Sequence, residues 1–266
     1  MTISRIVSNF ILIVFTVLVT VTSAVAEDVQ QSDAGAAHRK LRGVYALVAT
    51  GTKGVPFAAV GLFRPKRDGT FDGQAIDNFF GETVTDTFQG TLKFDSRSTG
   101  TLTLTTSGNE TFTKSFVVMD RGKQIWFEST DPGEVELVTG TRQINRRTFT
   151  TRHLSGTWAF ACNGSETNQQ TGVAGPVTSL GTLSRDGAGN FSGSGTYNRN
   201  GAIVGATFTG TSTVNSDGTF SNSGQYTNGL QGNFADSGVI QTASQLAAIS
   251  TSSHGAIACS YKRLGR

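Results

Sequence analysis

Two cysteines, Cys162 and Cys259, and three histidines, His38, His153 and His254, are the side chains of this sequence best suited to hold a metal or act as nucleophiles. The cysteines lie far apart and lack the short spacing of zinc ligands. The sequence contains neither the Gly-x-Ser-x-Gly motif of a nucleophile elbow nor a glycine-rich phosphate loop. We therefore expect no metal, no cofactor and no catalytic residue, and a barrel enzyme stays open as an alternative.

The first residues resemble a secretory signal. Arg5 precedes the apolar run FILIVFTVLVTV at 10–21, and the small residues AVA follow at 24–26. The run is shorter than the roughly 20 residues that span a bilayer, so we expect cleavage after Ala26, with an uncleaved anchor as the alternative. The prediction is a signal peptide over 1–26, a flexible leader over 27–40, and a secreted, periplasmic or cell-surface protein with no stable membrane span after cleavage.

The charge balance argues against nucleic acid as a partner. Without Arg5 the chain carries 21 basic and 19 acidic residues, so its net charge is close to neutral. Residues 39–147 hold 15 basic and 12 acidic groups, whereas 148–266 hold 6 and 4. The second part is rich instead in Gly, Ser, Thr and Asn, and has few large apolar side chains.

Composition and internal repeats indicate two similar all-β units. The chain has 33 glycines and 18 phenylalanines, with many threonines, which favours strands joined by tight turns. LRGVYALVATG at 41–51 matches LSGTWAFACNG at 154–164, RPKRDGTFDG at 64–73 matches LSRDGAGNFSG at 183–193, and QIWFEST at 124–130 matches QLAAIST at 245–251. We therefore expect one domain over 41–147 and a second over 152–266.

Each unit contains eight short runs with strand character. Those of the first are about 43–50, 57–65, 70–78, 84–95, 99–106, 111–119, 123–129 and 134–142. Those of the second are about 156–163, 177–185, 189–198, 202–214, 218–226, 229–239, 245–251 and 255–263. A meander of eight strands removes its exposed edges by closing. The predicted fold is two tandem eight-stranded up-and-down antiparallel β-barrels.

The cysteines predict how the second barrel closes. Cys162 lies in its first strand and Cys259 in its last, and an exported protein favours their pairing as a disulfide. If they oppose each other in an antiparallel ladder, Trp158 faces Arg263. The repeat transfers this register to the first unit, where Tyr45 faces Arg142. In both units a guanidinium stacked on an aromatic ring would plug one end of the barrel. The three histidines then lie in the leader and at opposite barrel ends, and cannot converge.

This pattern resembles the structural signature of the calycins, the lipocalin and avidin group. The resemblance rests on Gly156-x-Trp158 in the first strand and Arg263 in the last. The first unit departs from it with Gly43-x-Tyr45, and neither a lipocalin Thr-Asp motif nor a terminal helix is evident. The chain also resembles Gly- and Thr-rich exported bacterial repeat proteins of unknown function. The calycin resemblance implies a cup that binds a small, mostly apolar molecule.

Four residues of the first unit are candidate ligand contacts. The register places Glu136 opposite Gly51, on the inward face near the open mouth, where a carboxylate could hold a polar ligand group or act as an acid or base. The favoured alternative is a bulge that turns Glu136 outward. Phe79 and Phe80, in a mouth loop, and Trp126 are the aromatic candidates, with core packing as the alternative for each. In the second unit, the loop 163–175 could form a lid.

The same register predicts an apolar outer wall on the first unit. The side chains expected to face outward there are Val44, Ala46, Val48, Val135, Leu137 and Thr139. Those of the second unit are Thr157, Ala159, Ala161, Ala258, Ser260 and Lys262. An apolar patch of this kind is rarely left in water. We expect this wall to pack against the second unit, with self-association as the alternative.

The leading functional hypothesis is a secreted or periplasmic binding protein for a small apolar molecule, with the cavity in the Phe-rich first barrel. The alternative, from a different class, is a cell-surface or matrix protein for structure or adhesion, with no small-molecule ligand.

Overall fold

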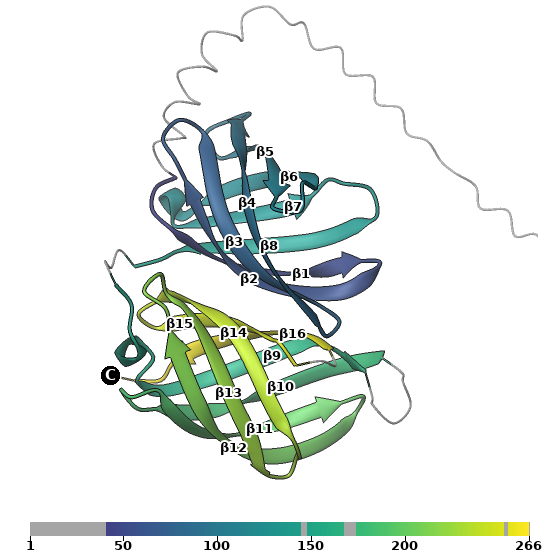
Figure 1. Ribbon diagram of the computed structural model, residues 1–266, viewed down its shortest axis with the longest axis vertical. Coiled ribbons are helices and arrows are strands. Elements are labelled where there is room, and N and C mark those ends of the chain that lie inside the picture. Colours follow the sequence, from purple (N-terminus) through teal and green to yellow (C-terminus); the bar gives the residue numbers. More distant parts are fainter. Residues whose placement is uncertain (1–40, 145–147, 168–173, 253–254, 266) are drawn as a thin grey trace, which may run out of the picture.

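A computed structural model describes residues 41–144, 148–167, 174–252 and 255–265. They form two closed antiparallel barrels of eight strands each, in tandem, which confirms the predicted fold class (Figure 1). The first barrel contains β1 (Tyr45–Lys53), β2 (Val55–Pro65), β3 (Thr70–Phe79), β4 (Glu82–Phe94), β5 (Thr99–Thr106), β6 (Thr111–Met119), β7 (Gln124–Ser129) and β8 (Glu134–Arg142). The second contains β9 (Gly156–Thr167), β10 (Ala174–Arg185), β11 (Asn190–Arg199), β12 (Ala202–Val214), β13 (Thr219–Asn228), β14 (Asn233–Thr242), β15 (Gln245–Ser250) and β16 (Gly255–Arg263). The predicted signal peptide and leader lie outside the described residues.

The abundance of glycine and phenylalanine has one explanation in both barrels. Phe71 on β3 lies opposite Gly90 on β4, and Phe191 on β11 lies opposite Gly210 on β12. A Cβ added to Gly90 would lie 2.7 Å from the Phe71 ring, and one added to Gly210 would lie 2.4 Å from the Phe191 ring. The missing side chain leaves room for a phenyl ring to lie across the neighbouring strand. Glycine and phenylalanine together therefore fill these narrow barrels.

Each barrel closes by pairing its first strand with its last, in the predicted register. In the first barrel β1 pairs with β8 and Tyr45 lies opposite Arg142. In the second barrel β9 pairs with β16 and Trp158 lies opposite Arg263. Closure leaves neither barrel with an open sheet edge.

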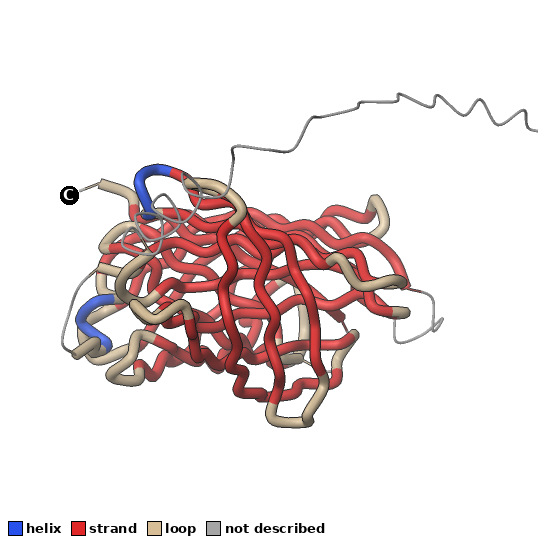
Figure 2. The backbone as a smooth tube through the Cα atoms, turned by 90° about the horizontal axis from the view of Figure 1, so that it is seen from above, coloured by secondary structure: helices blue, strands red, loops and turns tan. Residues whose placement is uncertain are grey.

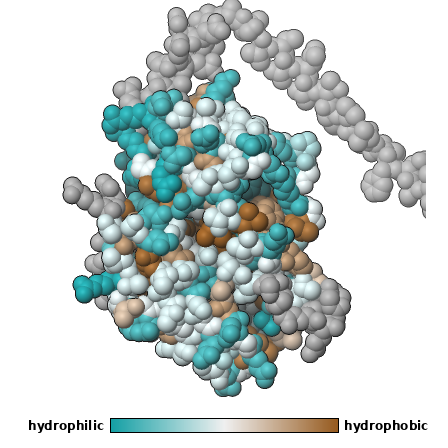
Figure 3. Space-filling model, viewed as in Figure 1, coloured by the Kyte–Doolittle hydropathy of each residue, from teal (hydrophilic) through white to brown (hydrophobic). Residues whose placement is uncertain are grey.

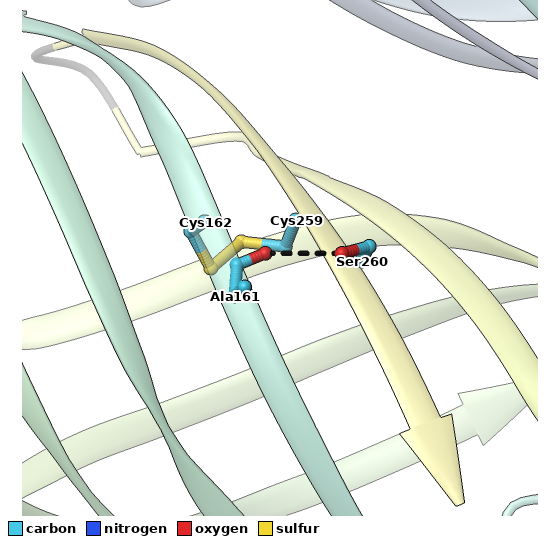
Figure 4. The surroundings of a disulfide bond; sticks show 4 residues. All are labelled: Ala161, Cys162, Cys259 and Ser260. Carbon is cyan, nitrogen blue, oxygen red and sulfur yellow. Dashed lines mark hydrogen bonds between the residues drawn. A yellow bond between two sulfur atoms is a disulfide. The ribbon is translucent and has the colours of Figure 1, made fainter.

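The predicted disulfide joins the closing strands of the second barrel (Figure 4). Cys162 on β9 and Cys259 on β16 lie directly opposite each other in the ladder. Beside them, the Ser260 hydroxyl donates a hydrogen bond to the Ala161 carbonyl at 3.4 Å. The bond spans 97 positions of sequence, and closing a loop of that size stabilises a fold by about 2–4 kcal/mol.

An aromatic–arginine pair closes one end of the second barrel. The Arg263 guanidinium carbon lies 4.7 Å from the centroid of the Trp158 ring. Arg263 also donates a hydrogen bond from Nη2 to the His153 carbonyl at 2.7 Å, and the Trp158 indole donates to the Leu154 carbonyl at 2.7 Å. The indole N–H of the fully buried Trp158 ring therefore has an acceptor.

The first barrel closes its corresponding end with Tyr45, but among the described residues Arg142 makes no cation–π contact with this ring, so the predicted stack is confirmed in the second barrel only. The Tyr45 hydroxyl donates a hydrogen bond to the Gly122 carbonyl at 2.5 Å. Burial raises the pKa of Tyr45 to about 12, although the charge of Arg142 opposes the rise. The Arg142 stem passes beside Gly43, where a Cβ would lie 3.7 Å from Cδ. Gly43 has a φ of +90°, which favours glycine.

The two barrels have their plugged ends on the same side of the molecule. The short helices η1 (Asp120–Gly122) and η2 (Thr151–His153) lie at the plugged ends of the first and second barrel. Figure 2 shows both helices at one end of the molecule. The two open ends therefore lie together at the opposite end.

An apolar interface joins the barrels. From the first barrel it contains Ala46, Ala58, Val60 and Leu62, and from the second Val239, Ala247, Ile249, Ala256 and Ala258. All of them are buried. Figure 3 shows hydrophobic side chains gathered across the middle of the molecule, where the barrels meet. The outward side chains of β1 thus pack against the second barrel, as predicted.

The second strand of this wall was wrongly predicted. The structure uses β2 rather than β8, since Val135 and Leu137 remain 72% and 49% exposed. In the second barrel, β14 and β15 join β16 in place of β9. The physical reason lies in the segment 57–63, FAAVGLF, which is apolar on both faces. A strand of this kind is covered on both sides.

Amide side chains also link the barrels. Asn78 at the end of β3 is fully buried and donates to the carbonyls of Ser250 and Gly255 at 2.5 and 2.8 Å. Near the plugged ends, Gln143 donates to the Ile240 carbonyl at 2.8 Å. The interface is therefore hydrogen-bonded near both ends of the barrels.

The second barrel holds a fuller core than its composition suggested. Its buried aromatic residues are Phe149, Trp158, Phe160, Phe191, Phe208, Phe220 and Tyr261. The expectation of few large apolar side chains in this unit is wrong for the interior, because its aromatic rings concentrate there. The disulfide therefore reinforces a packed core.

Candidate functional site

The first barrel contains a cavity of about 160 Å³ that opens at its unplugged end. A single water needs a cavity of about 10–15 Å³, so the space suits a small organic molecule. Phe63, Phe71 and Phe127 line its deep part, and Phe57 and Phe79 lie nearer the opening. These rings pack in tilted and edge-to-face pairs, such as Phe63 with Phe127 at 5.4 Å. The floor is apolar and shaped by ring packing.

Six ionisable side chains line the same cavity toward its opening. They are Lys53 on β1, Asp77 on β3, Asp86 on β4, Lys114 on β6, and Glu134 and Glu136 on β8. We call them the mouth cluster. Charged groups in the wall of a mainly apolar cavity are expensive to bury unless they are paired. Their partners therefore indicate what the cluster does.

Two ion pairs account for four members of the mouth cluster. Lys114 contacts Glu136, and the Lys53 ammonium lies 2.9 Å from a carboxylate oxygen of Glu134. Ser129 donates a second hydrogen bond to Glu134 at 3.0 Å. The Lys53 ammonium also lies 4.1 Å from the centroid of the Phe112 ring, within range of a cation–π contact.

The ion pairs set the protonation of this half of the site. Burial raises the pKa of Glu134, but hydrogen bonds from Lys53 and Ser129 outweigh it, so the pKa stays below its usual value. Burial lowers the pKa of Lys114, and the carboxylates of Glu134 and Asp131 oppose that change.

The two aspartates differ in their partners. Asp86 accepts hydrogen bonds from the backbone N–H of Ser107, at 3.0 Å, and from its hydroxyl. Among the described residues, Asp77 accepts no hydrogen bond and forms no ion pair. Burial, reinforced by the charge of Asp86, raises the pKa of Asp77 to about 6, although Lys114 and Lys53 oppose the rise. Asp77 is thus the carboxylate of the cluster that has no hydrogen-bond or ion-pair partner among the described residues.

Two of the four predicted contact residues line the cavity and two do not. Phe79 lines the cavity. Glu136 faces inward opposite Gly51 without a bulge, so the outward alternative is wrong. Phe80 lies in the β3–β4 turn with a φ of +53° and does not line the cavity. Trp126 is wrong as a cavity residue, because it lies on the outer wall of β7 and is 42% exposed. Its position on the strand puts it out of phase with the inward Ile125 and Phe127.

Sequence reasoning missed five members of the mouth cluster, namely Lys53, Asp77, Asp86, Lys114 and Glu134. Asp77 had a detectable signal, because counting by twos along the strand from Phe71 places Asp77 on the same face. The inward direction of that face becomes certain only when β3 is paired with its neighbours. The expected lid of 163–175 is shortened, since β9 and β10 extend into it, and its remaining residues 168–173 lie outside the described part of the chain.

The mouth cluster belongs to the first barrel alone. In the strand registers, the corresponding positions of the second barrel hold Glu166, Tyr197, Ala206, Asp236, Gly255 and Ile257. The two copies thus share an aromatic residue paired opposite an arginine at the plugged end but differ at all six mouth positions. The plug positions therefore belong to the shared fold, whereas the mouth cluster is a property of the first barrel.

The second barrel buries a different polar group. Arg185 is 4% exposed, and its guanidinium carbon lies 5.4–5.7 Å from the ring centroids of Phe191, Phe220 and Tyr261. It donates one long hydrogen bond, of 3.4 Å, to Asn222. Desolvation inside the barrel raises the pKa of Asp236 to about 6, although Asn222 and Arg185 oppose it. Aromatic rings thus surround this arginine near the plugged end of the second barrel.

Two broader properties concern the described residues as a whole. None of their helices is long and apolar enough to cross a membrane. Their His, Cys, Asp and Glu side chains form no group of three or more arranged to hold a metal ion.

Comparisons with known proteins place the chain in no family, because neither a family model nor a curated protein matches it. The chain is similar to a redesigned β-barrel, at 21% identity and a TM-score of 0.33, over 41% of this chain and 96% of the other. It is similar to a protein of unknown function from the DUF3598 family of Nostoc punctiforme, at 10% identity and a TM-score of 0.29, over 87% and 99%. It is also similar to isotype 1 transferrin binding protein B from serogroup B Neisseria meningitidis, at 8% identity and a TM-score of 0.33, over 85% and 77%. These similarities carry no functional conclusion.

Proposed function

We propose that this protein is an exported binding protein that holds a small molecule with an apolar body inside its first barrel. The observation that carries the proposal is the 160 Å³ cavity, with an aromatic floor and a charged mouth, at the open end of that barrel. Rigid apolar walls with a few polar groups are typical of small-molecule sites. Binding accounts for this cavity without a chemical reaction on the ligand, so binding is the activity that we assign.

The difference between the two barrels supports this assignment. A mouth cluster that served only to stabilise the fold would be useful in both copies. The second copy folds with Tyr197 and Ile257 at positions where the first has Asp77 and Glu136. The resemblance to calycins, which rests on the aromatic–arginine plug, points to the same kind of cup.

Export is the second part of the proposal. The apolar run at 10–21 supports it as a signal peptide. The Cys162–Cys259 disulfide supports it as well, because such bonds persist in oxidising compartments.

The test is titration of the full chain with an environment-sensitive apolar dye. Ala75 lines the cavity, so Ala75→Phe fills part of the space that the dye needs. We expect dye affinity to fall at least about tenfold in this variant, which corresponds to the loss of a well-packed apolar contact surface. The matched control is Ala202→Phe, which adds the same ring at an exposed position of the second barrel.

The dye titration has one outcome that supports the proposal and one that contradicts it. Loss of dye binding in Ala75→Phe with normal binding in Ala202→Phe supports the proposal. Equal binding by the two variants, with both folded by circular dichroism, contradicts a site in the first cavity.

One observation favours assembly as a second candidate function. Trp126, Val135 and Leu137 lie exposed on β7 and β8 of the outer wall. Apolar side chains gathered on a sheet face often mark contacts between proteins. Sedimentation of the full chain distinguishes this function, because assembly predicts concentration-dependent oligomers that Trp126→Ser abolishes.

A further inference from the structure

We propose that Asp77 receives the protonated amine of the ligand, so that the molecules bound are small apolar amines. This inference rests on the proposed function and specifies its ligand class. It starts from a cavity whose floor is apolar and whose mouth holds one carboxylate that has no hydrogen-bond or ion-pair partner among the described residues.

The pairing within the mouth cluster leaves one carboxylate, Asp77, with no hydrogen-bond or ion-pair partner among the described residues. Lys114 is paired with Glu136, and Lys53 with Glu134. Asp86 accepts two hydrogen bonds from Ser107, both at Oδ1. Asp77 lines the same cavity, and among the described residues no donor reaches it. A ligand that carries a donor can therefore satisfy Asp77 without breaking an existing contact.

The net charge of the mouth cluster favours a ligand whose donor group is positively charged. Four carboxylates and two ammonium groups face the cavity, which gives a net charge of −2 when all are ionised. A cation lowers this imbalance, whereas a carboxylate ligand increases it. Charge-assisted hydrogen bonds are also stronger than neutral ones. An alcohol of the same shape gains only the apolar contacts and a weaker hydrogen bond.

Aromatic rings support a cation in the same place. Phe79 and Phe88 line the cavity with Asp77, and Phe79 lies two residues beyond it along β3. The Lys53–Phe112 contact shows that an ammonium already lies over a ring in this mouth. An amine beside Asp77 would combine an ion pair with a neighbouring aromatic surface.

Protonation of Asp77 makes the selectivity depend on pH. The ionisable groups that face the cavity with it are Lys53 on β1, Asp86 on β4, Lys114 on β6, and Glu134 and Glu136 on β8. Within the described residues, β2, β5 and β7 add no ionisable side chain to the lining. Because its pKa is raised to about 6, Asp77 loses its charge in mildly acidic solution. Amine binding should weaken there while binding of a neutral molecule does not.

The experiment uses three probes that share one apolar body: 1-aminoadamantane, 1-adamantanol and adamantane-1-carboxylate. Binding to the full chain is measured by calorimetry. At about pH 7.5 we expect the amine to bind about tenfold or more tightly than the alcohol, and the carboxylate to bind weakest. Asp77→Asn should remove the advantage of the amine and leave alcohol affinity within about twofold. Lowering the pH to about 5 should weaken amine binding about tenfold in the unsubstituted protein and not in Asp77→Asn.

Asp72→Asn is the matched control. It removes a carboxylate from the same strand, but from the outer face, where Asp72 pairs with Lys66 at 3.0 Å. It should change neither the affinity ratio nor its pH dependence.

The two proposals fail in different ways. Equal affinities for amine and alcohol, unchanged by Asp77→Asn, overturn the amine inference and leave the binding function intact. If no adamantane probe and no apolar dye binds the folded protein, the binding function is overturned, and the amine inference falls with it.

Discussion

Asn78 is the single side chain whose loss should most clearly separate the two barrels. Its amide group donates hydrogen bonds to the carbonyls of Ser250 and Gly255 in the second barrel. Its carbonyl oxygen accepts a third, of 2.6 Å, from the Gly81 N–H in its own β3–β4 turn. Asn78→Ala removes all three and leaves two carbonyls at the interface without their donor.

The magnitude follows from these contacts. Each hydrogen bond contributes about 1 kcal/mol net, and a buried polar group left without a partner costs about 1–3 kcal/mol. Asn78→Ala should therefore lower the free energy of unfolding by about 2–4 kcal/mol, or roughly 1 M or more in the urea midpoint. Asn198 offers a matched control, because it holds the corresponding position on β11 and accepts a bond of 2.9 Å from Gly201 in its own turn. Asn198→Ala should cost only about 1 kcal/mol.

The assay is urea unfolding followed by tryptophan fluorescence. Each barrel contains one tryptophan, Trp126 in the first and Trp158 in the second. Replacing one of them by Phe lets the other report on its own barrel. We expect the two barrels to unfold at more widely separated urea concentrations in Asn78→Ala than in the unsubstituted protein. A shift no larger than that of Asn198→Ala would refute the reasoning that these bonds tie the barrels together.

Three further predictions test other parts of the structure. Val60→Lys puts a charge into the buried interface and should destabilise the protein by several kcal/mol. Leu137→Lys on the exposed wall should change the urea midpoint little. Similar urea midpoints for the two variants would contradict the burial of Val60 between the barrels. Reducing the Cys162–Cys259 bond should lower stability by about 2–4 kcal/mol, with the loss confined to the signal of Trp158, and a loss seen equally by both tryptophans would argue against a local effect. The folded protein holds the proton of Asp77 more tightly than the unfolded chain does, because the pKa of Asp77 is raised. This stabilisation is fully present below the unfolded pKa and is lost as the pH rises through about 6. Asp77→Asn should therefore stabilise the protein by about 1–3 kcal/mol at neutral pH and little at about pH 4, and an equal effect at both would show that Asp77 is not buried as described.

The closure of both barrels was determined by the sequence because its signals are local or covalent. Alternation along a strand, tight turns and repeated segments depend on neighbouring residues. Only one long-range pairing was needed, and the cysteine pair supplied it. Once Cys162 was set opposite Cys259, counting by twos placed Trp158 opposite Arg263. The repeat then extended the register to Glu136 in the first barrel.

The site and the interface were decided by the tertiary structure. Asp77, Asp86 and Lys114 come from strands whose mutual register no covalent bond or repeat reveals. They meet only because the barrel curves and brings β3, β4 and β6 around one opening. The outer wall depends in the same way on how two curved surfaces fit, so Val60 is buried while Leu137 stays in water. A strand pattern states which side chains share a face, and only the packed barrels decide what that face meets.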